Sequence, residues 1–391
     1  MRGEKGPELS VLKNFWLEPR YRSRRIALFF AALVALTDLG VRAWFSRPGI
    51  IDRNPGNTTA SMPYLFSQMG KSTRPRIAFI GSSVTQGYGN TPDGKHFPAL
   101  VGAELRSHGS PGAAVFNLSS AGNRFGDHFA NLVEAARYHP DLAVCAIHIK
   151  MFSVNAGLAD PLNHDESLYY FRGDPVFGRG GARDMTQRFR TSDRRYREIW
   201  LDFQAQKLSG LYRYRRLLSY FLIHDHQFPA AAAGERAKKA LGLIDPILVE
   251  SSDTNYDERN ADYLWKVIPD HVIQLQYLQC EAFDFSDENL NFLTFRDMCA
   301  WARDHRLRMM FFLNPINKDF VEARRFFDWA EVVPLFRKRV AEVTQEYGHL
   351  LVDATTRIDP RYFSDLDHLN MNGHKQMAAV LMPYIGVALR H

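Results

Sequence analysis

The 391-residue sequence lacks most features that mark specialised protein classes. It has only three cysteines, Cys145, Cys280 and Cys299, and no CxxC pair, which excludes a disulfide framework and argues against structural zinc or thioredoxin-like chemistry. Basic blocks interleaved with aromatic residues are sparse, so no nucleic-acid binding is expected. The formal net charge of +6 suits an anionic glycan or a membrane surface equally well.

Motifs for common cofactors and metals are also missing. The sequence has no GxxxxGK[ST] phosphate-binding loop, no GxGxxG and no HExxH, and His368 with His374 has no obvious third metal ligand. We therefore predict neither a cofactor nor a metal. Apolar residues make up 46% of the chain and charged residues 24%, which is typical of a folded globular protein.

One long apolar run is present, at residues 26–45, and it has the length of a bilayer-crossing helix. Asp38 and Arg42 lie in its second half, where a charge at the bilayer centre costs about 2.5 to 3.5 kcal/mol. Because they are four residues apart on one helical face, they can pair with each other or extend toward the far interface. A buried amphipathic helix of a soluble protein remains the alternative.

The orientation of this helix follows from the basic residues before it. The positive-inside rule places residues 1–25 in the cytoplasm and the rest of the chain outside, beyond the inner (cytoplasmic) membrane in the periplasm. No clear A-x-A cleavage site follows, so we expect an uncleaved single-pass anchor. The basic residues are Lys13, Arg20, Arg22, Arg24 and Arg25.

After a linker at residues 46–73, residues 74–391 alternate short apolar runs with amphipathic stretches, which predicts an α/β domain with a mostly parallel sheet covered by helices on both faces. A mainly helical insertion is expected at about residues 156–285. Its GLYRYRRLLSYFL stretch suits a glycan, a lipid headgroup or a protein neighbour, or is simply a solvated helix. Strands are predicted at 76–80, 114–118, 142–149, 308–313 and 349–353, and helices at 97–107, 127–138, 289–305, 333–347 and 372–389.

Ser83 is the candidate nucleophile. It lies in GSSVTQGYG, directly after the first predicted strand, at the sheet edge where open α/β proteins place ligands. Gly81 permits a tight exit from the strand, and Gly87 and Gly89 let the loop fold back. A purely structural serine in a glycine-rich turn is the alternative.

A serine nucleophile needs a base, usually a histidine oriented by a carboxylate. Asp365 and His368 have the spacing that one helical turn brings to the same side, just before the last predicted helix. Asp367 is the second choice of acid, and a surface turn or helix cap is the alternative for the whole motif. Rival bases are His374, His148 and His96.

Acyl transfer also needs donors for an oxyanion. The backbone N–H of Ser83 is one candidate, and Gly122, in NLSSAG after the second predicted strand, is the other. A turn glycine with Asn117 bonding locally explains the same residues.

These motifs, in this order, resemble the SGNH or GDSL hydrolase superfamily, whose fold is a three-layer, flavodoxin-like α/β/α sandwich. GSS stands at the family's GDS block, so Ser83 matches the nucleophile, Gly122 the oxyanion glycine, and DLDH the terminal DxxH, with His368 as base and Asp365 as its partner. The family's GxND block is absent. AIHIKMF stands there, with Lys150 in the asparagine's place as a charged oxyanion donor or as an ion-pair residue.

The sequence is more similar still to the DltD-like branch of that superfamily, which also has GSS, an N-terminal anchor and no such asparagine. LNPINKDF at residues 313–320 and SDENL at residues 286–290 resemble further segments of the branch. The resemblance implies transfer of acetyl or D-alanyl groups to a cell-envelope polysaccharide or related polymer, with a membrane-bound O-acyltransferase as partner. The alternatives are a plain carbohydrate or lipid deacylase and a non-catalytic glycan-binding or scaffold subunit.

Overall fold

A computed structural model of the chain describes residues 22–45, 62–87, 94–108, 110–155, 160–164, 167, 170, 201–202, 204–206, 208–215, 218 and 261–390. Its core is one parallel five-stranded sheet in the order β2-β1-β3-β4-β5. Each predicted strand is present, with small differences at the ends. The strands are β1 (Arg76–Ile80), β2 (Ala114–Asn117), β3 (Leu142–Ile147), β4 (Met309–Leu313) and β5 (Leu350–Asp353).

The central strands are buried on both faces, because β3 and β4 have no exposed position. Successive side chains of a strand point to opposite faces, so Phe311 and Phe312 mark the two sides. Phe312 packs at 5.8 Å, between ring centroids, on Phe97 of α5 (Phe97–Ser107). Phe311 packs at 5.5 Å on Phe295 of α15 (Leu290–Asp304). The sheet therefore has a helical layer on each side.

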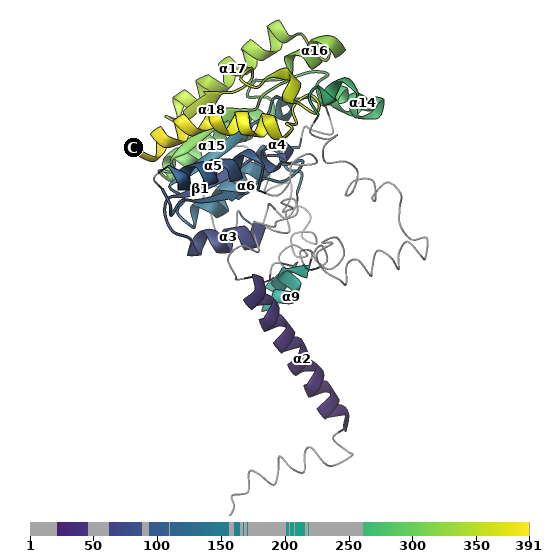
Figure 1. Cartoon of the computed structure of the whole chain (residues 1–391), viewed down its shortest axis with the longest axis vertical. Coiled ribbons are helices and arrows are strands. Elements are labelled where there is room, and N and C mark those ends of the chain that lie inside the picture. The colour runs from purple at the N-terminus through teal and green to yellow at the C-terminus, as the bar shows by residue number, and fades with distance from the viewer. Residues whose placement is uncertain are drawn as a thin grey trace, which may run out of the picture.

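Helix pairs complete the two layers (Figure 1). On one face α5 packs against α18 (Met371–Arg390), and on the other α15 packs against α6 (Phe125–Ala136) and α17 (Trp329–Glu346). The predicted three-layer α/β/α sandwich is thereby confirmed.

Helices α17 and α6 begin earlier than the sequence predicted, because side chains accept backbone N–H groups at their first turns. Asp328 accepts the N–H groups of Ala330 (2.8 Å) and Glu331 (3.2 Å), so α17 begins at residue 329. Asp127 accepts the N–H of Arg124 at 3.0 Å and starts α6. A third helix, α16 (Lys318–Arg324), was not expected.

Part of the expected linker belongs to the folded domain. Residues 62–71 form α3 (Met62–Lys71), whose Met62, Leu65, Phe66 and Met69 are buried in the core. The ring of Phe66 stacks on that of Tyr138 at 6.1 Å. Apolar burial thus overrides the turn-forming prolines and glycines that suggested a linker.

The two ends of the expected insertion lie next to each other at the surface of the sheet domain. Ser153 and Phe283 form an antiparallel bridge, with the N–H of Val154 donating to the carbonyl of Ala282 at 3.1 Å. Of the insertion, the structure describes short parts, which include α9 (Gly210–Arg213), η6 (Leu264–Lys266) and α14 (Asp270–Leu278).

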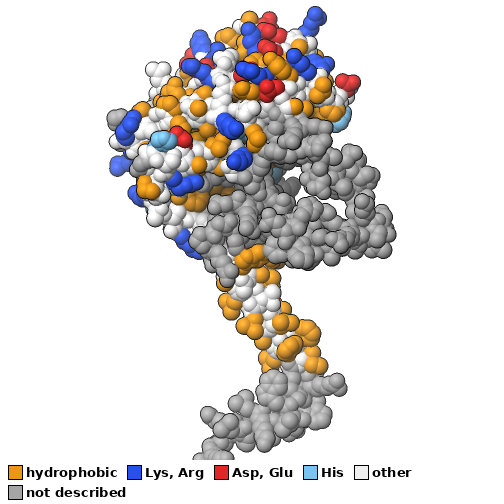
Figure 2. Space-filling view, viewed as in Figure 1, with side chains coloured by type: hydrophobic (Ala, Val, Ile, Leu, Met, Phe, Trp, Pro, Cys, Tyr) orange, Lys and Arg blue, Asp and Glu red, His pale blue; other side chains and the backbone are white. Residues whose placement is uncertain are grey.

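The N-terminal helix α2 (Arg22–Phe45) projects from the domain as an apolar stalk (Figures 1 and 2). Its segment Ile26–Trp44 has a mean hydropathy of 1.9 and only 6% of a membrane-length window is buried. Among the described residues, this is the one helix long and apolar enough to be a membrane span or a signal sequence.

Candidate active site

Ser83 is the first residue of α4 (Ser83–Gln86), directly beyond the carboxyl end of β1. The turn that presents it requires Gly81, since a Cβ there would lie 2.2 Å from Oγ1 of Thr85 and 3.1 Å from Cβ of Ala146. The short helix ends at Gly87, whose φ of +84° is left-handed. Because β1 lies between β2 and β3, Ser83 stands where the strand order reverses, the usual crevice for ligands.

His368 and Asp365 form a hydrogen-bonded chain with Ser83. Nε2 of His368 lies 2.8 Å from Oγ of Ser83, and Nδ1 lies 2.7 Å from Oδ2 of Asp365. The other oxygen of Asp365 accepts the N–H groups of Asp367 (2.9 Å) and His368 (2.8 Å). Asp365 and His368 are therefore brought together by a turn that the Asp365 carboxylate closes, and not by the helical turn that the sequence suggested.

Several contacts fix the loop that carries this pair. The N–H of Ser364 donates to the carbonyl of His368 at 2.8 Å, and Phe363 bridges Leu369. From the LNPINKDF segment, the amide Nδ2 of Asn317 donates to the carbonyl of Asp365 at 3.2 Å. The backbone N–H of Asn317 also donates to the carbonyl of Leu366 at 2.8 Å. The loop after β4 thus holds the acid in place.

Gly122 lies in a loop that is hydrogen-bonded to the turn before Ser83. The carbonyl of Gly81 accepts Nδ2 of Asn123 at 3.0 Å and the N–H of Ser120 at 3.4 Å. Gly122 has a φ of +77°, a conformation that favours glycine. Among the described residues, the N–H groups of Gly122 and Ser83 have no hydrogen-bond acceptor, so both remain available as donors to an oxyanion.

Asp367 presents a second carboxylate to His368, with Oδ1 at 3.4 Å from Nδ1. The same oxygen pairs with Nζ of Lys150 at 3.1 Å, and Oδ2 contacts Nε2 of His148. Since Nδ1 of His148 accepts the N–H of Lys150 at 3.0 Å, the ring proton is on Nε2 and faces the carboxylate. Lys150 thus makes the ion pair that the sequence left open as one of its two roles.

The sequence did not predict this buried network. Its signal was nonetheless present, because Lys150 is a charged residue that closely follows a fully buried strand, and such a residue requires a partner. The side chain of Asp367 is only 3% exposed, so its charge depends on Lys150 and His148.

Burial and neighbouring charges shift the pKa values of His368 and Asp367 in opposite directions. Burial disfavours the charged imidazolium of His368, but the charges of Asp365 and Asp367 outweigh it and raise its pKa to about 9. Burial also opposes the charge of Asp367, yet Lys150, His148 and His368 together hold its pKa well below the usual value. Burial lowers the pKa of His148, although Asp367 acts in the opposite direction.

The other candidate bases have structural roles. Nδ1 of His374 accepts the N–H of Phe97 at 3.3 Å, and burial lowers the pKa of His374 to about 3. His96 caps α5 by accepting the N–H of Ala99 at 3.3 Å, and burial lowers its pKa to about 4. Of the candidate histidines, only His368 contacts Ser83 in the part of the chain that the structure describes.

One group of side chains has the composition of a metal site. Ligand atoms of Asp365, Asp367 and His368 lie within 4.8 Å of one another. Each of these atoms already has a protein partner, because His368 lies between Ser83 and Asp365, and Asp367 contacts Lys150 and His148. The arrangement therefore suits proton transfer better than metal binding.

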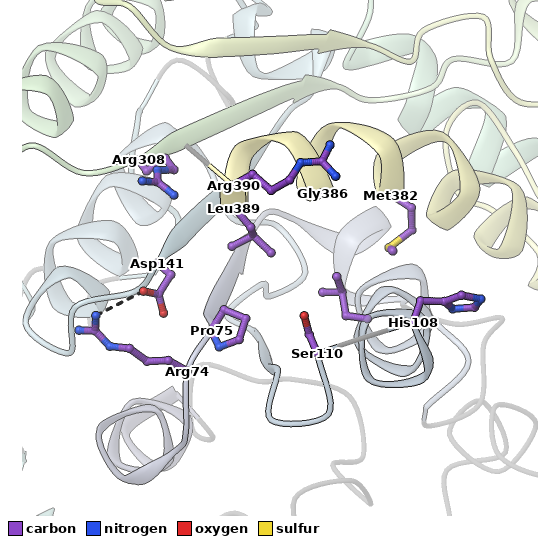
Figure 3. A pocket seen from close by; sticks show the side chains of 11 residues that line it. Arg74, Pro75, His108, Ser110, Asp141, Arg308, Met382, Gly386, Leu389 and Arg390 are labelled. Atoms are coloured by element: carbon purple, nitrogen blue, oxygen red, sulfur yellow. Dashed lines mark ion pairs between the residues drawn. The ribbon is translucent and has the colours of Figure 1, made fainter.

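A cavity of about 600 Å³ lies at the opposite edge of the sheet (Figure 3). Pro75, Asp141 and Arg308 line it, and they directly precede β1, β3 and β4. Arg74 and Asp141 form an ion pair of 3.4 Å at its rim. Ser83 follows the other end of β1, so this cavity lies away from the Ser83, His368 and Asp365 cluster.

Comparison with known proteins gave likenesses of fold but not of sequence. No family model and no curated protein matches the chain. LAE5, an alpha/beta hydrolase enzyme from the metagenome of Lake Arreo, has a TM-score of 0.35 and 14% identity over 82% of this chain and 99% of its own. An acylhydrolase candidate from Bacteroides fragilis has a TM-score of 0.38 and 11% identity over 85% of this chain and 99% of its own. A catalytic mutant of an acetylxylan esterase from Geobacillus stearothermophilus has a TM-score of 0.35 and 12% identity over 81% of this chain and 95% of its own.

Proposed function

We propose that the chain is a membrane-anchored, extracytoplasmic serine acyltransferase or esterase of the SGNH type. The observation that carries this proposal is the hydrogen-bonded chain from Ser83 through His368 to Asp365, at the carboxyl edge of a parallel sheet. Two unused backbone donors, on Ser83 and Gly122, supply what an oxyanion would need.

The chemistry runs through an acyl-enzyme. Neutral His368 takes the hydroxyl proton of Ser83 on Nε2 while Oγ attacks the carbonyl carbon of an O-acyl ester. The oxyanion accepts the two backbone N–H groups, and Asp365 stabilises the imidazolium. The C–O bond to the leaving alcohol then breaks, and that oxygen takes the proton from His368. In the second half, water or an acceptor hydroxyl attacks the acyl group and returns Ser83 to its starting state.

The proposal extends to the DltD-like branch and to a cell-envelope glycan or related polymer as acceptor of an acetyl or D-alanyl group. Support comes from the stalk-like α2 and from the GSS and LNPINKDF segments. Asn317 of the latter contacts the loop of Asp365. A membrane-bound O-acyltransferase would then supply the acyl group from within the membrane.

Covalent labelling tests the nucleophile. We expect a fluorophosphonate to add one adduct to the protein, located at Ser83 by peptide mass spectrometry, and Ser83→Ala to abolish both the adduct and esterase turnover, by about 10⁴-fold or more. Ser82→Ala is the matched control, because Ser82 is a buried neighbour whose side chain caps no N–H group. Labelling of Ser83→Ala at an unchanged rate would refute the assignment.

Two alternatives predict different products or phenotypes. A deacylase releases the same free acid with or without an acceptor glycan, whereas a transferase forms an acylated glycan. A non-catalytic glycan-binding or scaffold subunit predicts that cells with Ser83→Ala keep normal envelope acylation.

A further inference from the structure

The carboxylate of Asp38, within the apolar stalk, is bound by the insertion. Its Oδ1 accepts the hydroxyl of Ser209 at 2.7 Å and the N–H of Leu211 at 2.8 Å, and its Oδ2 accepts Nε of Arg42 at 2.7 Å. The side chain of Asp38 is only 15% exposed. The charge of Asp38, which is costly within a membrane span, therefore has three hydrogen-bond donors. Two of them belong to a segment far along the chain.

Arg42 and Gly210 bring the two helices into direct contact. Nη2 of Arg42 donates to the carbonyl of Leu208. A Cβ on Gly210 would lie 2.4 Å from Cγ of Arg42 and 3.2 Å from the carbonyl oxygen of Asp38. Figure 1 shows α9 beside the end of α2 that is nearer the domain. The insertion is thus fixed to the stalk and not merely near it.

The level of this contact along α2 indicates its depth in a bilayer. A hydrocarbon core of about 30 Å takes about 20 helical residues. If the basic sequence through Arg25 stays at the cytoplasmic boundary, the core ends near residue 45. Asp38 and Arg42 then lie about 5 to 10 Å inside the outer boundary, which is the depth of interfacial helices.

Side chains of the docked segment suit that depth. Leu208 is 81% exposed and Leu201 is 58% exposed, although both are large and apolar. Tyr212 is also exposed, and the guanidinium of Arg215 lies 3.9 Å from its ring centroid. Tyrosine and arginine at the edge of an apolar face are typical of residues at the boundary of headgroups and acyl chains.

We propose that the described residues of the segment 201–215 form a second membrane-contacting element, seated at the outer headgroup–acyl boundary and fixed there by Asp38 and Arg42. The element rests on the membrane anchoring proposed above. It also makes α2 a permanent structural part of the protein rather than a cleaved leader, because the insertion binds it.

Spin-label depth measurement on the purified full-length protein in phospholipid vesicles tests this. Single cysteines are placed at Leu208, at Leu36 in the span and at Leu335, an exposed residue of α17. The native cysteines are fully buried, and unsubstituted protein controls for their labelling. We expect labels at positions 36 and 208 to be relaxed mainly by oxygen, and the label at 335 mainly by a water-soluble nickel chelate.

The double variant Asp38→Leu/Arg42→Leu tests the polar contacts between α2 and the segment 201–215. It conserves net charge and keeps the span apolar. We expect it to move the label at position 208 into water while the label at 36 stays in lipid. Thr37→Val is the matched control, because among the residues that the structure describes the Thr37 hydroxyl bonds only the carbonyl of Leu33 in its own helix.

The outcomes separate the two proposals. A label at 208 in water with the label at 36 in lipid overturns the membrane-contacting element but leaves the anchor intact. A label at 36 in water overturns the anchoring itself. A label at 208 shielded from both relaxing agents indicates a protein contact and refutes the lipid assignment. An unchanged depth in the double variant refutes the role of Asp38 and Arg42.

Discussion

Oδ1 of Asp367 lies 3.4 Å from Nδ1 of His368, the nitrogen that Asp365 already binds at 2.7 Å. Two carboxylates thus face one imidazole, but their surroundings differ. Asp365 accepts two backbone N–H groups of its own loop, whereas Asp367 is paired with Lys150 and contacts His148. We infer that Asp365 orients the ring and that Asp367 tunes its charge.

Substitution of the two acids should separate these roles. Asp365→Asn should lower kcat by about 10⁴-fold, because the amide no longer holds the required imidazole tautomer. Asp367→Asn should keep most of its activity at its own optimal pH. The measurement is ester turnover over a range of pH, with circular dichroism to verify folding. The inference fails if the Asp367 variant is the more damaged at every pH.

The pH profile should reflect the raised pKa of His368. The base works only when neutral, so kcat/KM should rise with pH and level off above a midpoint near pH 9. Asp367→Asn removes a negative charge that raises this pKa, so its midpoint should move to lower pH.

Asp319→Asn, which changes an exposed acid on α16, should leave the midpoint unchanged and serves as the control. A midpoint that responds equally to both substitutions would mean that the local charge of Asp367 does not set it.

Lys150→Met distinguishes the two roles that the sequence allowed for this residue. The positive charge of Lys150 lowers the pKa of His368, so its removal should move the midpoint to higher pH, with an unchanged plateau. Loss of the ion pair of buried Asp367 with Lys150 should also lower the free energy of unfolding by about 3 kcal/mol, measured by denaturant titration. If Lys150 instead binds the oxyanion, the plateau itself should fall by about 10² to 10³.

Gly81→Ala should damage both stability and activity. The new Cβ would collide with buried Thr85, and relief of that collision must displace the turn that holds Ser83. We expect a loss of about 3 kcal/mol in the free energy of unfolding. Gly386→Ala is the control, because a Cβ there meets nothing within 4 Å in α18, and it should stabilise the protein by about 0.5 to 1 kcal/mol.

The sequence predicted the sheet well because its strands are short apolar runs between turns, and burial on both faces leaves that signal in each strand separately. Ser83, Asp365 and His368 could be grouped in advance because parallel strands bring the loops after their carboxyl ends to one edge. Their catalytic roles remain predictions that the experiments above test.

The network around Asp367 could not be predicted in the same way. It joins Lys150, after β3, to a loop more than two hundred residues later, and such contacts leave no local periodicity. The role of Asn317 was hidden for the same reason. Asp38 was recognised as costly in a membrane, but Ser209 and Leu211, the partners that offset the cost, lie far away in the chain.

The bridge between Ser153 and Phe283 has a consequence for how such a protein diversifies. Because the long excursion starts and ends at adjacent points, changes of its length add little closure entropy. The length of the excursion can therefore change while the strands that position Ser83 stay the same. Exchange of the excursion between relatives would change the residues that surround the site of Ser83, while the sheet that positions this serine stays the same.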